Sequence, residues 1–120
     1  MNAGNSTWPW PDSLDALQAA PANHELLLDN DRVRVVHTRI RSGETVPLHT
    51  HRWPCVLFIL SWSDLIRRDQ DGNVLVDTRQ NAEPPKLNTP SWQEHLPPHS
   101  VENVGGGEIN TIQVEIKVAG

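Results

Sequence analysis

The sequence predicts an all-β fold in which about eight or nine short strands form a sandwich or a barrel. Three observations support this prediction. Apolar and polar residues alternate along much of the chain, most clearly over residues 109–118. The 120 residues include ten prolines and seven glycines, and a proline inside a helix costs about 3 kcal/mol. Turn signals such as Asp71-Gly72 separate the alternating segments. Long helices are therefore excluded.

One helix is expected before the strands begin. Residues 12–20 place Leu14 and Leu17 on one face, Asp12 or Ser13 can accept the first free amide hydrogens, and Pro21 ends the segment. Residues 1–11, which contain Trp8 and Trp10, are expected to form an irregular arm.

The strands follow the helix in short runs bounded by turns. The expected strands and extended segments are residues 33–40, 45–51, 55–62, 64–68, 73–78, 92–96 and 109–118. Residues 55–62 are the most apolar of these, so they are expected to form a buried central strand. Pro47 indicates a sheet edge or a bend, because proline cannot donate to a strand ladder. Pro97-Pro98 indicates a tight corner before His99.

Composition excludes several classes of protein. The length allows one domain. The formal net charge of −5 and the absence of a basic stripe argue against nucleic-acid binding. No apolar run of about 18 residues is present, so no membrane partner is expected. The N-terminus does not resemble a secretory signal, and the single cysteine, Cys55, fits a reducing compartment. A cytoplasmic protein with a small-molecule partner is the remaining expectation.

Histidines are abundant, with six in the chain. His49 and His51 are two apart on an extended segment, so both imidazoles project from the same face. His99 follows the two prolines and can be directed toward the same face. Three such imidazoles can bind one metal ion and leave its other positions open. We therefore predict that these three histidines form a metal site, whereas His24 is expected at the surface.

The segments around these histidines resemble a known family. Gly43-Glu-Thr-Val-Pro-Leu-His49-Thr-His51 is similar to the first half of the first cupin motif, which has glycine, five residues and then His-x-His. Pro97-Pro98-His99-Ser-Val-Glu-Asn103 is similar to the second motif, in which a proline-containing turn precedes histidine, three residues and asparagine.

The resemblance implies a small single-domain cupin. It implies a double-stranded β-helix, also called a jelly-roll barrel, with a metal ion inside its mouth and commonly a homodimer. Residues 31–120 would form the single cupin domain, and residues 1–30 would form an N-terminal arm and short helix packing on the barrel. Asn103 would fix the turn after His99 through hydrogen bonds to the backbone.

The sequence departs from the first motif at its glutamate. The family has this glutamate three or four residues after the second histidine, and Cys55 occupies its place under the shorter spacing. Positions 49, 51, 53 and 55 share a face if the strand is regular. Cys55 is therefore open to three interpretations: a thiolate ligand, a thiol lining the pocket, or a small buried side chain. Trp53 and Phe58 are further pocket candidates.

The resemblance leaves the reaction open, and the catalytic residues are unknown. Within the family, sites of three histidines are similar to those of iron-dependent thiol dioxygenases and of a β-diketone-cleaving dioxygenase. A dioxygenase or isomerase acting on a small organic molecule is the first hypothesis, with Fe, Zn, Ni or Mn as the divalent ion. The alternative is a non-catalytic module that binds a small ligand, as sugar-sensing cupins do.

Overall fold

The computed structural model describes residues 8–117, and nearly all of its regular structure is β-strand. The elements are η1 (Asp12–Leu14), α2 (Ala16–Ala19), β1 (His24–Asp29), β2 (Val33–Ile40), β3 (Thr45–His51), β4 (Cys55–Ser61), β5 (Leu65–Asp69), β6 (Val74–Asp77), η2 (Thr78–Gln80), β7 (Ser91–Gln93), β8 (Leu96–Asn103) and β9 (Ile109–Ile116). The predicted all-β fold is confirmed. None of the helices in this part of the chain is long and apolar enough to cross a membrane.

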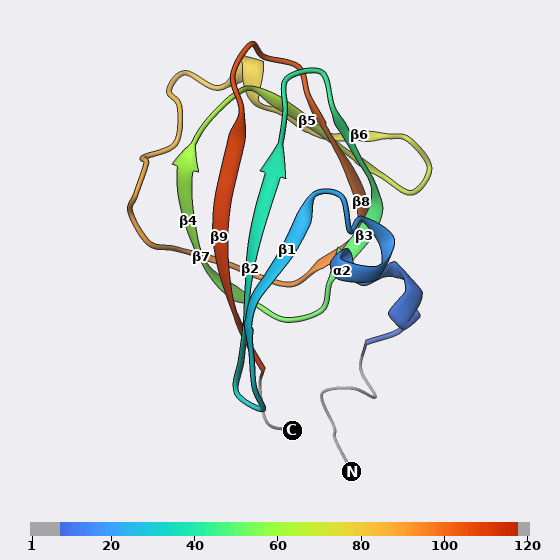
Figure 1. The fold of residues 1–120 in the computed structure, drawn as a ribbon. Coiled ribbons are helices and arrows are strands. Elements are labelled where there is room, and N and C mark those ends of the chain that lie inside the picture. The colour runs from blue at the N-terminus through green and yellow to red at the C-terminus, as the bar shows by residue number, and fades with distance from the viewer. Residues whose placement is uncertain (1–7, 118–120) are drawn as a thin grey trace.

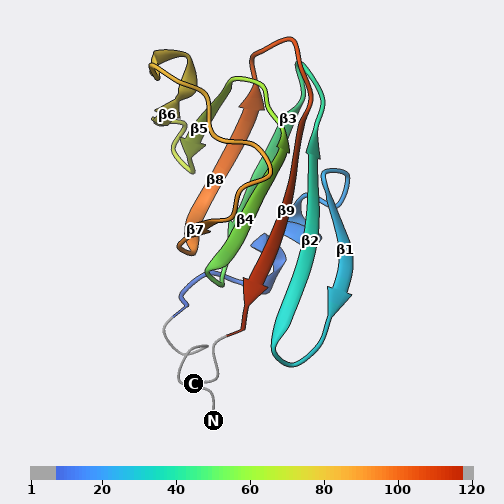
Figure 2. The same ribbon diagram turned by 90° about the vertical axis from the view of Figure 1, so that its left-hand side faces the viewer.

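Two antiparallel sheets face each other. One has the strand order β1-β2-β9-β4-β7 and the other the order β3-β8-β5-β6. In Figure 2, β5, β6 and β8 of the four-stranded sheet lie on the left, and β9, β2 and β1 of the five-stranded sheet lie on the right. Strands that are distant in sequence are neighbours, since β2 pairs with β9 and β3 pairs with β8. The architecture is that of a jelly-roll barrel.

The N-terminal segment packs beside β3 (Figure 1). The expected helix over residues 12–20 is instead a 3-10 turn followed by one turn of α-helix, with Asp15 between them. Asp15 is extended, forms a bridge with Thr50, and binds Arg34 through its carboxylate. These tertiary contacts interrupt the helix, and Asp15 becomes its N-cap by accepting a hydrogen bond from the Leu17 amide.

The first strand lies outside the domain boundary expected at residue 31. β1 pairs with β2 from His24↔Thr38 to Asp29↔Arg34, so the sheet begins at residue 24. The arm expected over residues 1–11 lies partly outside the described residues, which begin at Trp8. The ring of Trp8 packs edge-on against His95, with 5.1 Å between their centroids.

The prolines lie where the strand ladders allow them. Pro47 is on β3, which is an edge strand, as expected. The predicted corner at Pro97-Pro98 is wrong, because both residues belong to β8. The pairing of β8 with β5 begins only at His99, after the two prolines. The prolines lack N–H groups, but the hydrogen bonds between β8 and β5 do not need them.

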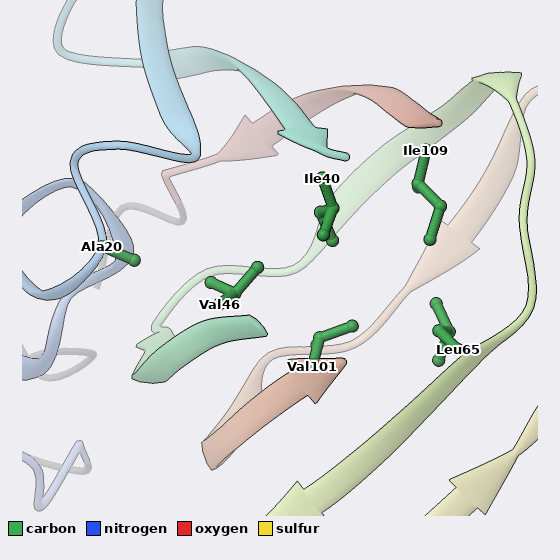
Figure 3. Packing of buried hydrophobic residues seen from close by; sticks show 6 residues of the cluster. All are labelled: Ala20, Ile40, Val46, Leu65, Val101 and Ile109. Atoms are coloured by element: carbon green, nitrogen blue, oxygen red, sulfur yellow. The ribbon is translucent and has the colours of Figure 1, made fainter. Parts of the chain in front are cut away.

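The apolar core lies between the two sheets. Figure 3 shows six of its buried side chains converging from both sheets and from the segment before β1: Ala20, Ile40, Val46, Leu65, Val101 and Ile109. β4 is paired on both sides, but most of its residues are only half-buried. It is therefore less buried than expected, because one face of its antiparallel sheet points away from the core.

Candidate metal centre

A cavity of about 230 Å³ lies between the inner faces of the two sheets. Five of the six core residues just named contribute to its wall. The polar side chains that line it are His24, Thr38, His49, His51, Arg67, Thr78, Gln93, His99, Thr111 and Gln113. A larger hollow of about 410 Å³ lies between residues 78–85 and the turn at residues 105–107, and none of the described residues that line it is a histidine. The smaller cavity is therefore the candidate metal site, because four histidines line it.

The structure brings together the three histidines that the sequence singled out. His49 and His51 share a face of β3, and their Nε2 atoms are 3.1 Å apart. His99 is directly opposite His49 in the β3–β8 pairing, with 4.3 Å between ring centroids. Two nitrogens bound at right angles to one ion, each about 2.1 Å from it, lie about 3.0 Å apart. The Nε2 separation of His49 and His51 fits such a pair.

A fourth histidine joins them. His24 opens β1, and its ring centroid is 5.0 Å from that of His49. The ligand atoms of His24, His49 and His51 all lie within 4.8 Å of one another, so these three buried residues could hold a metal ion. The expected surface position of His24 is therefore wrong. His24 is buried, and so is Thr38, the residue with which it pairs across β1 and β2. The sequence carries no local signal for this, because it depends on that register.

The free nitrogens of three of these rings can be assigned from their hydrogen bonds. Nδ1 of His49 lies 2.7 Å from the Pro47 carbonyl oxygen, and Nδ1 of His99 lies 2.7 Å from that of Pro97. Nδ1 of His24 lies 2.9 Å from the Ala20 carbonyl oxygen. A carbonyl only accepts, so each Nδ1 carries the proton and donates. Each Nε2 therefore keeps a lone pair, which is the form that binds a metal ion.

The fourth ring, that of His51, is backed by a buried carboxylate. Its Nδ1 has no hydrogen-bond partner and lies 3.8 Å from Oε2 of Glu115. Glu115 is 1% exposed, and its other oxygen accepts from Nε of Arg34. Arg34 also donates to both carboxylate oxygens of Asp15. A carboxylate behind a ligating imidazole is a common way to orient the ring and raise its basicity.

Burial holds three of the clustered imidazoles neutral. It lowers the pKa of His24 from 6.5 to about 4 and that of His99 to about 3, with a smaller contribution from the charge of His51. The same two causes lower the pKa of His49 well below its ordinary value. Near neutral pH, His24, His49 and His99 therefore offer uncharged nitrogen ligands.

The pocket candidates at and beyond β4 do not line the cavity. Phe58 pairs with Ile112, on the face of the sheet opposite the cavity-lining residues Leu57 and Ile59. Trp53 lies in the β3–β4 connection, with the guanidinium of Arg34 5.0 Å from its ring centroid. Neither Trp53 nor Phe58 is therefore among the residues that line the cavity.

Cys55, the third pocket candidate, is also not among the residues that line the cavity. It is 4% exposed and pairs with Glu115 across β4 and β9. Burial, with the charge of Glu115 as a smaller cause, raises the pKa of its thiol to about 12. The structure therefore favours the small buried side chain among the three interpretations of Cys55.

Asn103 closes the turn after β8. Its side chain donates to the carbonyl oxygens of Ile40 and Gly107, and it accepts from the Gly105 amide and the Ser63 hydroxyl. At Gly105 an added Cβ would lie 2.2 Å from the Ser63 Oγ, so only glycine fits there. The predicted role of Asn103 in fixing the turn matches this arrangement.

The histidine cluster predicts a pH-dependent stability. We expect protein stripped of metal by a chelator to be less stable at pH 5 than at pH 7.5. Below pH 6.5 the unfolded imidazoles take up protons, whereas folded His24 stays neutral down to about pH 4. The unfolded state then binds more protons, so the free energy of unfolding falls by about 2 kcal/mol for this residue between pH 6.5 and 5. Urea titrations at the two pH values measure the change.

A single substitution separates this contribution from the others. In His24→Asn the difference in unfolding free energy between pH 7.5 and pH 5 should shrink by about that 2 kcal/mol. An unchanged pH dependence would contradict the burial of a neutral His24.

Comparisons with known proteins agree with this architecture. No protein-family model and no curated protein sequence matches the chain. Among solved structures, a cupin domain from Bordetella pertussis Tohama I is similar over 79% of this chain and 92% of its own, with 21% identity and a TM-score of 0.63. An RmlC-like cupin with a double-stranded β-helix fold from Methanocaldococcus jannaschii is similar over 78% and 77%, with 15% identity and a TM-score of 0.54. The polyketide cyclase RemF from Streptomyces resistomycificus is similar over 88% and 73%, with 15% identity and a TM-score of 0.53.

Proposed function

The chain has the cupin fold, a double-stranded β-helix, and from this premise we propose that it binds one divalent metal ion in the barrel and acts there on a small organic molecule. His49, His51 and His99 are the proposed ligands, and His24 is added as a fourth. The observation that carries the proposal is the set of Nε2 lone pairs that the bonds to Pro47, Pro97 and Ala20 leave free. The Nε2 atoms of His49 and His51 lie 3.1 Å apart, a separation that suits two ligands of one ion.

The chemistry follows from the donor set. A divalent ion held by neutral imidazoles keeps its full charge and can polarise a bound oxygen or nitrogen atom of a substrate. The chain's own residues orient the ligands: backbone carbonyls fix His24, His49 and His99, and Glu115 lies behind His51. Apolar side chains such as Leu57 and Ile59 restrict water. A dioxygenase-like reaction fits a site of this kind, and RemF, a polyketide cyclase of the same fold, supports action on small organic molecules.

Metal analysis tests the proposal. Protein purified without added ions should contain about one Fe, Zn, Ni or Mn ion per chain, and chelation should lower Tm by about 10 °C, because an ion bound only to the folded state stabilises it. Oxygen consumption and product formation are then measured with β-diketones, thiols and sugars. Absence of stoichiometric metal, together with no Tm shift on adding Fe²⁺, Zn²⁺, Ni²⁺ or Mn²⁺, would overturn the proposal.

One observation favours a second candidate function. Among residues 8–117, no aspartate or glutamate lines the cavity, so these residues place no carboxylate there for acid–base catalysis. A module that binds a small ligand, with or without the ion, would need none. Ligand binding without turnover of any compound in the panel would favour this function.

We also propose that the protein is a cytoplasmic homodimer. The location rests on the single cysteine of the sequence. For the dimer, Figure 1 looks onto the outer face of the five-stranded sheet, and no other sheet of residues 8–117 lies over it. Side chains there alternate with the buried ones, so Val35, Val56, Phe58, Ile112 and Val114 share this face. A contiguous apolar face is typical of an interface.

The dimer can be tested by measuring the mass in solution. We expect twice the chain mass of 13.5 kDa and a shift to the monomer in Val114→Glu, because a buried unpaired carboxylate opposes association. Val74 is 57% exposed on β6 of the other sheet, so Val74→Glu should remain dimeric. A wild-type monomer, or equal effects of both substitutions, would contradict the proposed interface.

A further inference from the structure

Arg67 is a cation without an acidic partner. It lies on β5, an inner strand of the four-stranded sheet, and its side chain lines the cavity. Its Nε atom is buried and has no hydrogen-bond partner. Within residues 8–117, no carboxylate lies within 4.0 Å of it, whereas Arg34 and the neighbouring Arg68 both form ion pairs. A buried donor left unpaired is costly, so its retention calls for an explanation.

The surroundings of Arg67 leave its charge uncompensated. In the described part of the chain, the other polar side chains of the cavity wall are threonines, glutamines and histidines, and none is acidic. Burial lowers the pKa of the guanidinium from its ordinary value, but arginine stays protonated in proteins. The cavity therefore carries a positive charge inside a chain whose formal net charge is −5. Glu115 lies behind His51 and not in the cavity lining, so the charge of Arg67 favours an anion within the cavity itself.

The position of Arg67 relates this charge to the histidines. Arg67 pairs with Val101 in the β5–β8 register, and His99 lies two residues before Val101 on the same face of β8. Two residues along a strand span about 7 Å. A ligand with one end on Arg67 therefore needs a backbone of only a few atoms to reach the histidine cluster.

The size of the cavity limits the ligand. Its volume of about 230 Å³ equals about eight water molecules at their share of liquid volume, which admits a ligand of about ten non-hydrogen atoms. A guanidinium presents a planar fork of N–H donors that matches a carboxylate. A small organic acid meets the charge, the shape and the volume together.

We propose that Arg67 binds the carboxylate of a small organic acid inside the barrel and directs its other end toward the histidine cluster. The inference names the substrate class of the proposed metal site and, in that respect, rests on the proposed function. Arg67 is thus a binding residue that selects anions through the part of its side chain that lines the cavity.

The test compares acids with their amides. Binding of 2-oxobutanoate, 2-hydroxybutanoate and benzoate, each beside its primary amide, is measured by calorimetry on metal-loaded and chelated protein. At least one acid should bind the wild type 10- to 100-fold more tightly than its amide, as expected for a charge-assisted pair. Arg67→Met should abolish that preference. Inorganic phosphate is measured in parallel, and binding of phosphate more tightly than every acid would overturn the carboxylate assignment.

Arg68→Met is the matched control. Arg68 is the next residue along β5, so its side chain points away from the cavity, and it is paired with Glu102. Its loss removes the same formal charge and should leave the acid preference unchanged. Arg67→Met should also raise Tm of the ligand-free protein by about 4 °C or more, because an apolar side chain replaces a half-buried cation whose Nε is buried without a partner. A lower Tm, or an acid preference that persists in Arg67→Met, would overturn the inference.

The metal measurement separates this inference from the proposed function. If the wild type holds one ion per chain but binds acids and amides equally, the inference fails and the metal site stands. If no ion binds but the acid preference depends on Arg67, the metal site fails and the anion site stands.

Discussion

Replacing His49 by alanine is expected to remove the metal ion from the protein. His49 is 2% exposed and lies at the centre of the cluster, with ring centroids 5.0 Å from His24, 4.9 Å from His51 and 4.3 Å from His99. Removing an outer partner of a ligand already lowers metal affinity 10- to 100-fold, so loss of this ligand should lower it by more than about 100-fold. Elemental analysis after dialysis should then find metal in the wild type and almost none in His49→Ala.

A second histidine supplies the control for this experiment. His95 is exposed and contacts the edge of Trp8, so His95→Ala should keep the metal content and the Tm shift on chelation. Circular dichroism of His49→Ala without metal checks that the sheets still form. Full metal content in a folded His49→Ala protein would contradict the assignment.

Glu115→Ala is expected to destabilise the fold by about 3–5 kcal/mol, which is typical of breaking a buried ion pair. The carboxylate is 1% exposed and accepts from Nε of Arg34. Without it, Arg34 keeps only Asp15 as a partner. Urea unfolding of metal-free protein measures the loss. Glu115→Gln should lose less, because its amide oxygen can still accept from Arg34.

The surface provides a matched pair for comparison. Glu102 binds Arg68 at 2.9 Å, with side chains 37% and 32% exposed. An exposed ion pair contributes about 0–1 kcal/mol, so Glu102→Ala should change the unfolding free energy by no more than that. Equal losses in Glu102→Ala and Glu115→Ala would show that burial of the Glu115–Arg34 pair has no special effect.

Metal affinity of Glu115→Gln should also fall about 10- to 100-fold if the carboxylate orients His51.

Local patterns in the sequence predicted much of the fold. Alternation predicted most strands to within a residue or two, for example residues 45–51 and 109–118 against the observed Thr45–His51 and Ile109–Ile116. Pro47 correctly indicated a sheet edge. Pro97-Pro98 was misread as a corner, since a proline can lie within a strand wherever no neighbour requires its N–H. The helix predicted over residues 12–20 was too long, because the contacts of Asp15 with Arg34 and Thr50 interrupt it.

The sequence by itself determined the His-x-His pair of β3, because a strand places residues i and i+2 on one face whatever surrounds it. It also determined that Cys55, rather than a glutamate, follows that pair. Only the tertiary structure brought His24 to the cluster, placed Glu115 behind His51, excluded Trp53 from the cavity and left Arg67 without a partner. These outcomes depend on which segments pair and in which register. Local periodicity does not encode such contacts between residues that are far apart in the chain.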